Sequence, residues 1–215
     1  MNLNPAADCR QNQTAKRDEN DVTGKVAADV GVRPTLIETG NRAPKIPDVG
    51  DKIPFGPYLW RVLQTNGDSA LIITEDIIKL RGYHTTHTVD MTWEACELRH
   101  YLNTTFYHSF NAAEQRRIIP MSVKNADNAI HGTKGGNDTT DHVFLLSEAE
   151  AEVFFKDDSD RVAYHDGEAQ WWWLRSPGRV QKGAARVNRQ GLVYVKANFT
   201  NYHAVGVRPV LWLKF

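Results

Sequence analysis

The sequence has few cysteines and no long apolar run, and each absence excludes a class of protein. Its two cysteines, Cys9 and Cys96, cannot form a disulfide framework or a cysteine-based zinc site. No apolar run is longer than four residues, so no segment is predicted to span a bilayer. The first 15 residues lack the basic start and the apolar stretch of a secretion signal, which leaves a cytoplasmic or virion-associated location as the expectation.

Aromatic residues are missing from the first quarter of the chain. All 21 of them lie at or after Phe55, and the opening residues are rich in Asn, Gln, Asp and Lys. Such a segment buries too little apolar surface to offset the entropy lost on ordering, which predicts a polar, largely flexible N-terminal arm over residues 1–48. Pro44 and Pro47 mark its end, so we expect one packed domain over residues 49–215.

Acidic residues are absent from Trp171 to Phe215, a stretch that holds eight of the chain's 26 basic residues. The whole chain balances its charges, with 26 basic and 26 acidic residues, which argues against a nucleic-acid binder. The local excess favours a basic surface for an anionic ligand. The alternative interpretation is that acidic segments, such as residues 138–168, face the basic ones across the fold.

One short sequence occurs twice. The residues Val30–Pro34 are repeated as Val205–Pro209, each reading Val-Gly-Val-Arg-Pro, and a leucine follows two residues after each proline. The N-terminal copy either preserves the last strand of a second domain copy or donates a strand, unless the identity is coincidental. A single repeated fragment does not indicate a solenoid, which needs several full repeats.

Local patterns in the first half of the domain predict a hairpin followed by a helix. The alternating residues 58–64 and the apolar residues 69–74 flank Asn66-Gly67, which is a strong hairpin signal. Next, apolar residues at helical spacing predict a helix with Thr92 as its N-cap that reaches Leu102.

Two further helices begin at capping-box sequences. One starts at Asn111 and ends before Pro120, and the other runs from Ser147 through Phe155. Between them we expect a long loop over residues 121–140 and a strand over residues 142–146. The remaining predicted strands are Trp171–Arg175, Ala184–Asn188, Leu192–Lys196 and Val205–Leu213. This order predicts an α+β fold with a mostly antiparallel sheet and two or three helices in the first half of the domain.

Side chains that could ligate a metal or act as a nucleophile occur, but none forms a recognised catalytic pattern. His84 and His87 have a ligand spacing but need a distant third ligand. Cys96 falls among apolar positions, which indicates a buried structural thiol. Two acidic loops carry oxygen ligands suited to Ca²⁺ without matching the EF-hand pattern; they contain Asn137, Asp138 and Asp141, and residues 157–160. We therefore expect no metal and no cofactor.

The C-terminal strands offer a different kind of surface. Their alternation puts apolar side chains on one face and a polar, aromatic and cationic set on the other. Such a mixture of rigid aromatic and adaptable hydrogen-bonding groups is typical of binding surfaces, although a solvated sheet face is the alternative. We call this set the C-terminal face. Its predicted contact residues are Arg186, Asn188, Tyr194, Lys196, Asn198, Phe199, Asn201, Tyr202 and His203, with Arg179, Lys182 and Arg189 at its rim.

Several ordered motifs mark a resemblance to a widespread bacterial and phage domain family of uncharacterised function. They are residues 56–63 (Gly-Pro-Tyr-Leu-Trp-Arg-Val-Leu), 92–94 (Thr-Trp-Glu), 98–103, 143–147 (Val-Phe-Leu-Leu-Ser), 172–178 (Trp-Trp-Leu-Arg-Ser-Pro-Gly) and 206–213. That family resembles a distant branch of the C-type-lectin-like fold, shared with formylglycine-generating enzymes and with the variable proteins of diversity-generating retroelements.

The sequence departs from the active members of that fold. Formylglycine-generating enzymes depend on a cysteine pair, and this domain contains only Cys96. The Glu-Pro-Asn, Gln-Pro-Asp and Trp-Asn-Asp tripeptides with which C-type lectins bind Ca²⁺ are absent. In the retroelement proteins the hypervariable stretch lies near the C-terminus, which corresponds here to about residues 179–203.

The resemblance therefore implies a non-enzymatic ligand-binding module that displays a variable C-terminal face, diversified by a retroelement, to a protein or an anionic ligand. One alternative is a metal-assisted or hydrolytic enzyme that uses His84, His87 and acidic loop residues. Another is a structural component of a phage or surface assembly.

Overall fold

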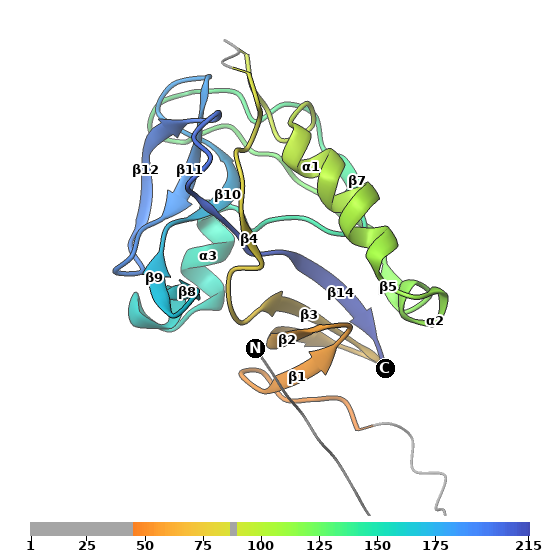
Figure 1. The fold of residues 1–215 in the computed structure, drawn as a ribbon. Coiled ribbons are helices and arrows are strands. Elements are labelled where there is room, and N and C mark those ends of the chain that lie inside the picture. The colour runs from red at the N-terminus through yellow and green to blue at the C-terminus, as the bar shows by residue number, and fades with distance from the viewer. Residues whose placement is uncertain (1–44, 87–89) are drawn as a thin grey trace, which may run out of the picture. The chain divides into compact units, whose positions relative to one another are not determined.

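The structure, a computed structural model, describes residues 45–86 and 90–215. Nearly all of the predicted arm, the repeat copy at Val30–Pro34 and His87 lie outside the described residues. The strands are β1 (Lys52–Phe55), β2 (Tyr58–Asn66), β3 (Ser69–Thr74), β4 (Lys79–Leu80), β5 (Ile118–Ile119), β6 (Met121–Val123), β7 (Thr139–Asp141), β8 (Ala163–His165), β9 (Glu168–Gln170), β10 (Trp172–Pro177), β11 (Gly183–Val187), β12 (Val193–Phe199), β13 (Gly206–Val207) and β14 (Val210–Lys214). The α-helices are α1 (Glu97–Tyr101), α2 (Ala112–Gln115) and α3 (Glu148–Phe154), arranged as Figure 1 shows.

The first large sheet has the strand order β1-β2-β3-β14-β5, and all of its pairs are antiparallel. Its central hairpin is the predicted one, because β2 pairs with β3 and Gly67 adopts a φ of 58° in the turn. Glycine adopts this left-handed conformation without a steric penalty, which is why Asn-Gly is such a strong turn signal.

The second large sheet has the order β12-β11-β10-β13-β4. Its pairs are antiparallel except for β10 and β13, which run parallel where Trp172 lies opposite Gly206. Within this sheet β12 has a neighbour on one side only, so one of the two strands of the C-terminal face is an edge strand (Figure 1).

The prediction of one continuous strand over residues 205–213 is wrong, because this segment passes from one sheet to the other. It forms β13 in the second sheet and β14 in the first. Between them, the side chain of Arg208 is fully buried and its Nε donates to the carbonyl of Thr74 at 2.8 Å. Pro209 has no N–H to continue a ladder, so the strand is interrupted where it changes partners.

The helices follow the sequence signals closely at two of three starts. Asn111 and Ser147 both close full capping boxes, as predicted, at the start of α2 and α3. The first helix begins later than predicted, because Cys96 rather than Thr92 is its N-cap and Cys96 Sγ accepts from Arg99 N. It then continues as a π-helical turn over Leu102–Phe106 and a 3₁₀ turn over Tyr107–Ser109.

The region between α2 and α3 also differs from the prediction at its ends. The predicted loop begins and ends in strands, since β6 pairs antiparallel with β7. Residues 142–146 do not form the predicted strand and make only an isolated bridge, from Phe144 to Val210. The side chains from Val143 to Leu146 are nevertheless buried. This apolar run therefore indicates a segment buried in the core and not a strand paired in a sheet.

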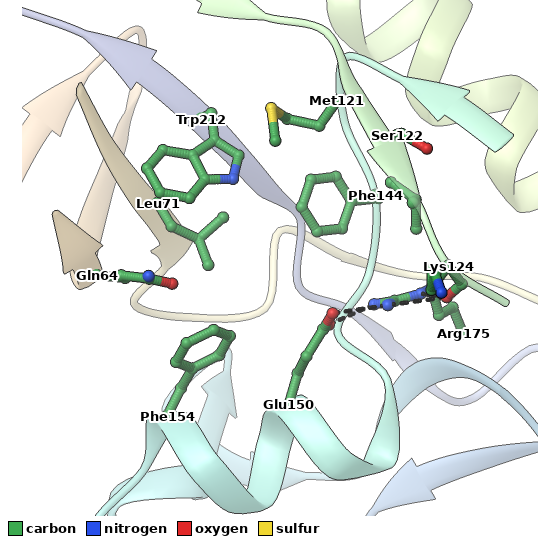
Figure 2. Close-up of a pocket in the computed structure, with 11 residues that line it drawn as sticks. Gln64, Leu71, Met121, Ser122, Lys124, Phe144, Glu150, Phe154, Arg175 and Trp212 are labelled. Atoms are coloured by element: carbon green, nitrogen blue, oxygen red, sulfur yellow. Dashed lines mark hydrogen bonds and ion pairs between the residues drawn. The ribbon is translucent and has the colours of Figure 1, made fainter. Parts of the chain in front are cut away.

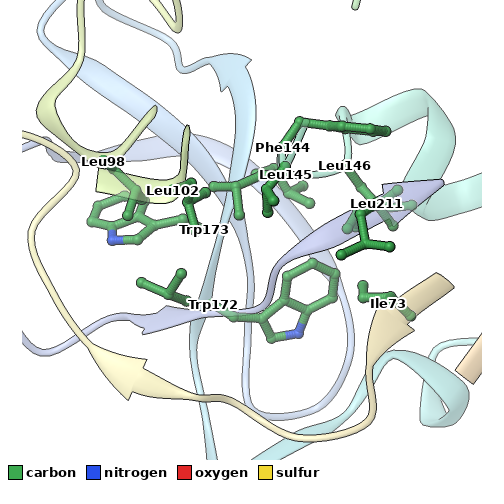
Figure 3. Close-up of a cluster of buried hydrophobic side chains, with 14 of the residues drawn as sticks. Ile73, Leu98, Leu102, Phe144, Leu145, Leu146, Trp172, Trp173 and Leu211 are labelled. Atoms are coloured by element: carbon green, nitrogen blue, oxygen red, sulfur yellow. The ribbon is translucent and has the colours of Figure 1, made fainter. Parts of the chain in front are cut away.

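A single apolar core joins the two large sheets. Trp172 and Trp173 are both fully buried, so both faces of β10 are covered. Figure 3 shows Trp172 directed toward Ile73 and Leu211, and Trp173 toward Leu98. The domain is therefore a mixed α+β structure with mostly antiparallel sheets and few helices. Within the described ranges, no helix is long and apolar enough to cross a membrane.

Candidate functional site

The centre of the C-terminal face is Arg186 on β11. It lies opposite Tyr194 of β12 in the strand register. Its guanidinium Cζ is 3.9 Å from the ring centroid of Trp171 and 5.6 Å from that of Tyr194. The two rings meet edge to face, with their centroids 5.5 Å apart. The guanidinium of Arg186 thus contacts two aromatic rings that also contact each other, and Arg186 is only 8% exposed.

The charge of Arg186 is not compensated by any residue that the structure describes. Its Nε has no hydrogen-bond partner, and no carboxylate pairs with it among the described residues. Burial, partly offset by the nearby Tyr194 and Tyr202, lowers the pKa of this guanidinium below its ordinary value. Arginine stays protonated in proteins, so the site keeps a positive charge that has lost much of its hydration.

Arg186 lines a hollow of about 270 Å³ on the surface, together with Gln170, Trp171, Arg189, Tyr202 and Ala204. Arg189 Nε donates to Gln170 Oε1 at 3.2 Å, and no ion pair joins Arg189 to a carboxylate in residues 45–86 or 90–215. Two guanidinium groups and a phenol therefore border one small concavity whose lining contains no acidic residue. This arrangement can bind an anionic group through charge-assisted hydrogen bonds.

Of the other predicted contact residues, three aromatic ones are exposed, and of these only Tyr202 lines this hollow. Tyr194, Phe199 and Tyr202 are 37%, 50% and 52% exposed. Lys182 Nζ lies 4.9 Å from the ring centroid of Phe199, and Arg179 is exposed. The result is an aromatic and cationic surface along the β12 edge.

Some predicted residues lie elsewhere or take other roles. Asn188 Oδ1 accepts from the backbone N–H groups of Gln190 and Leu192, so it stabilises the turn between β11 and β12. Asn201 is half-buried, and the exposed His203 lies against Gly82. The side chains of Lys196 and Asn198 lie outside the described part of the chain.

The sequence did not single out Trp171 as a site residue. Period-two alternation grouped it with Trp173, which is a core residue. In the structure Trp171 precedes β10, and its half-buried ring covers Arg186. One signal in the sequence could have indicated this role. Trp172 and Trp173 cover the two faces of the strand, so the third tryptophan, Trp171, was available for another contact.

The residues of the enzymatic alternative are not brought together. His84 Nδ1 accepts from Glu97 N at 3.4 Å, and its Nε2 lies 3.8 Å from Glu97 Oε1. No group of three or more His, Cys, Asp or Glu side chains suited to a metal ion occurs in the described ranges, which exclude His87. Burial raises the pKa of the Cys96 thiol to about 12, so it is not a nucleophile at neutral pH.

The acidic loops are occupied by internal contacts. Asp141 is buried and accepts from Trp93, Arg99 and Thr139. Asp157 Oδ1 accepts from Ser159 Oγ and Asp160 N, which organises its own turn. These oxygens stabilise the fold.

A second concavity, which the sequence did not indicate, lies on the first sheet. Gln64, Leu71 and Trp212 form one row across β2, β3 and β14, since Leu71 is register partner to both of the others. Figure 2 shows Phe144 and Phe154 facing this row across the same space. The cavity measures about 240 Å³, and its remaining lining residues are Met121, Ser122, Val123, Lys124, Glu150 and Arg175. We call it the aromatic pocket.

An ion pair closes one end of the aromatic pocket. Arg175 NH2 lies 2.7 Å from Glu150 Oε1, and Arg175 NH1 also contacts the other carboxylate oxygen. The same guanidinium donates to the carbonyls of Lys124 and Leu145. These contacts satisfy the polar groups of this wall within the protein itself.

No curated protein and no solved structure matches the chain. A family model described as a domain of unknown function (DUF6273) matches residues 67–215, which contain both candidate sites except for Gln64. Since this match covers well over half of the sequence, the chain belongs to the DUF6273 family.

Proposed function

We propose that the domain is a non-enzymatic ligand-binding module whose C-terminal face recognises a ligand carrying a negative charge. The C-type-lectin-like relationship belongs to this proposal, as does diversification of residues 179–203 by a retroelement. The face combines an edge strand, exposed aromatic rings and a cationic hollow, which are features of recognition surfaces.

The position of an uncompensated guanidinium, that of Arg186, on the wall of a surface hollow is the observation that carries the proposal. Desolvating a charge is costly unless a counter-charge or hydrogen bonds replace the lost water. Here the flanking rings of Trp171 and Tyr194 supply cation–π attraction but no hydrogen-bond acceptor for Nε. A carboxylate, phosphate or sulfate on a ligand would supply both a charge and acceptors in a planar or bidentate geometry that guanidinium groups favour.

The test is an array of acidic glycans and acidic or phosphorylated peptides, each printed beside its neutral counterpart. We expect the full chain to retain acidic members only, and Arg186→Gln to reduce their binding at least tenfold, because a desolvated charge pair is worth more than about 1.4 kcal/mol. The double variant Tyr194→Ala/Tyr202→Ala is expected to abolish retention with a nearly unchanged melting temperature.

Tyr164→Ala is the matched control, since Tyr164 is a 48% exposed tyrosine on β8 that does not line the hollow. Equal retention of neutral and acidic members, or undiminished binding by Arg186→Gln, would contradict the proposal. A large fall in melting temperature of the double tyrosine variant would assign those rings to the core instead.

A further inference from the structure

The hydrogen bonds of the tryptophans single out the aromatic pocket. The chain has six tryptophans, and four of their indole N–H groups donate to protein acceptors. The exceptions are Trp171 and Trp212, for which the described residues provide no acceptor. Neither N–H is among the buried polar atoms that lack a partner, so both are open to solvent and to a ligand. Trp171 lines the hollow of the C-terminal face, and Trp212 lines the aromatic pocket.

The walls of the aromatic pocket favour a flat, apolar ligand. Trp212, Phe144 and Phe154 present rings to one space, with Leu71 and Met121 between them (Figure 2). These side chains come from two strands of the first sheet, from β6, from the segment before α3 and from α3 itself. Aromatic rings stack on planar groups with a gain beyond area burial. Cavities for drug-sized ligands have about 300–1,000 Å³, so this one suits a smaller molecule.

The polar groups of the pocket define what the ligand must carry. The Trp212 N–H is a free donor within the described part of the chain, and the exposed Gln64 amide makes no other hydrogen bond there. Glu150 and Arg175 neutralise each other, which leaves Lys124 as the uncompensated charge of the lining. A ligand with a hydrogen-bond acceptor, neutral or singly anionic, fits this pattern better than a cation.

We propose that the aromatic pocket is a second ligand site, separate from the C-terminal face, for a planar aromatic compound of one or two rings that carries a hydrogen-bond acceptor. The rings of Phe144 and Phe154 hold its faces, and Trp212 donates to the acceptor. This site does not depend on the proposed function of the C-terminal face, because the two concavities share no residue.

The experiment measures binding of 2-naphthoate to the full chain by calorimetry. Cyclohexanecarboxylate, which keeps the charge but lacks the aromatic rings, and 2-naphthylmethylammonium, which reverses the charge, are the comparison probes. We expect saturable binding of 2-naphthoate at a site that persists in Arg186→Gln, and weaker binding of both other probes at that site. Absence of saturable 2-naphthoate binding, or equal binding of all three, would overturn the proposal.

Variants locate the probe. Phe154→Ala removes one wall and is expected to weaken binding at least fivefold. Trp212→Phe keeps the apolar ring but removes the donor, and is expected to weaken 2-naphthoate binding by about tenfold or more, the effect of losing one hydrogen bond to a charged acceptor. Val153→Ala is the matched control on the same helix, since Val153 is 78% exposed. Arg186→Gln should leave the affinity unchanged.

The two pocket variants distinguish the outcomes even if one of them folds poorly. If Phe154→Ala and Trp212→Phe both keep the wild-type affinity, or if Arg186→Gln alone removes binding, 2-naphthoate binds elsewhere and the proposal is wrong.

Discussion

At the scale of the residue, the buried polar groups of this domain fall into satisfied and unsatisfied sets. Asp141 belongs to the first, because it is 1% exposed and its two oxygens accept from Trp93 Nε1 at 2.9 Å, Arg99 Nε at 2.7 Å and Thr139 Oγ1 at 2.7 Å. It ties the first helix and the segment before it to β7. Arg186 belongs to the second, as does Arg208, whose NH1 and NH2 have no partner among the described residues. Arg186 differs from Arg208 because it lines a surface hollow that a ligand can enter, and this makes it the candidate binding charge.

Asp141→Ala should therefore be among the most destabilising single substitutions. It leaves the buried Trp93 N–H without an acceptor and the Arg99 guanidinium without its carboxylate. The loss of both contacts is expected to lower the free energy of unfolding by about 3 kcal/mol. Urea denaturation measures this change, and Glu152→Ala, at an exposed position of α3, is the control. A loss below 1 kcal/mol, roughly that of an exposed ion pair, would show that the network is not a stabilising unit.

At the scale of the element, the sequence predicted turns and helix caps but not which distant segments pack against each other. The Asn66-Gly67 hairpin and the capping boxes at Asn111 and Ser147 depend on residues close in sequence, so their signals are complete in the sequence itself. Thr92 failed as an N-cap because the chain turns at Trp93, whose buried indole is held by Asp141, a residue far along the chain.

The candidate sites divide in the same way. Alternation along β11 and β12 grouped Arg186 with Tyr194, which are register partners, but it did not predict that Arg186 is buried. It could not show that the Trp171 ring covers Arg186, because that contact depends on how β9 leads into β10. The aromatic pocket could not be predicted from the sequence, because its lining comes from segments between Gln64 and Trp212 that only the tertiary fold brings together.

The crossover from β13 to β14 allows an element-scale test. Gly206 lies between Trp172 and Leu80 in the strand register, and a Cβ at this position would lie 2.5 Å from Ile77 Cδ1. Gly206→Ala should force Ile77 or the strand to move and cost about 1–3 kcal/mol of unfolding free energy. Thermal unfolding measures it, with Ala204→Ser at an exposed position of the same segment as the control. An unchanged melting temperature would mean that the Ile77 side chain moves aside without cost.

At the scale of the whole molecule, one carboxylate couples stability to pH. Glu75 follows β3, and its Oε2 accepts a hydrogen bond from Arg61 Nε at 2.8 Å. Lys52 Nζ lies 2.9 Å from the other carboxylate oxygen, Oε1. Burial favours the neutral acid, but the hydrogen bonds and charges of Arg61 and Lys52 outweigh it and lower the pKa of Glu75 to about 2 from 4.5. The folded state therefore binds this proton less readily than the unfolded chain does.

The sign of the pH dependence follows from that difference. A depressed folded-state pKa stabilises the protein at pH values above the unfolded-state pKa. This contribution, on the order of 3 kcal/mol, is lost as the pH falls from about 4.5 to about 2.

Urea unfolding at pH 7, 5, 4 and 3 should show a steep decline in the free energy of unfolding for the wild type. Glu75→Gln should be less stable at pH 7 and decline less below pH 5. Asp68→Asn, which removes an exposed pair with Lys214, should follow the wild-type curve, because a solvent-screened charge has little effect on stability. Parallel curves for the wild type and Glu75→Gln would assign the acid sensitivity to other carboxylates.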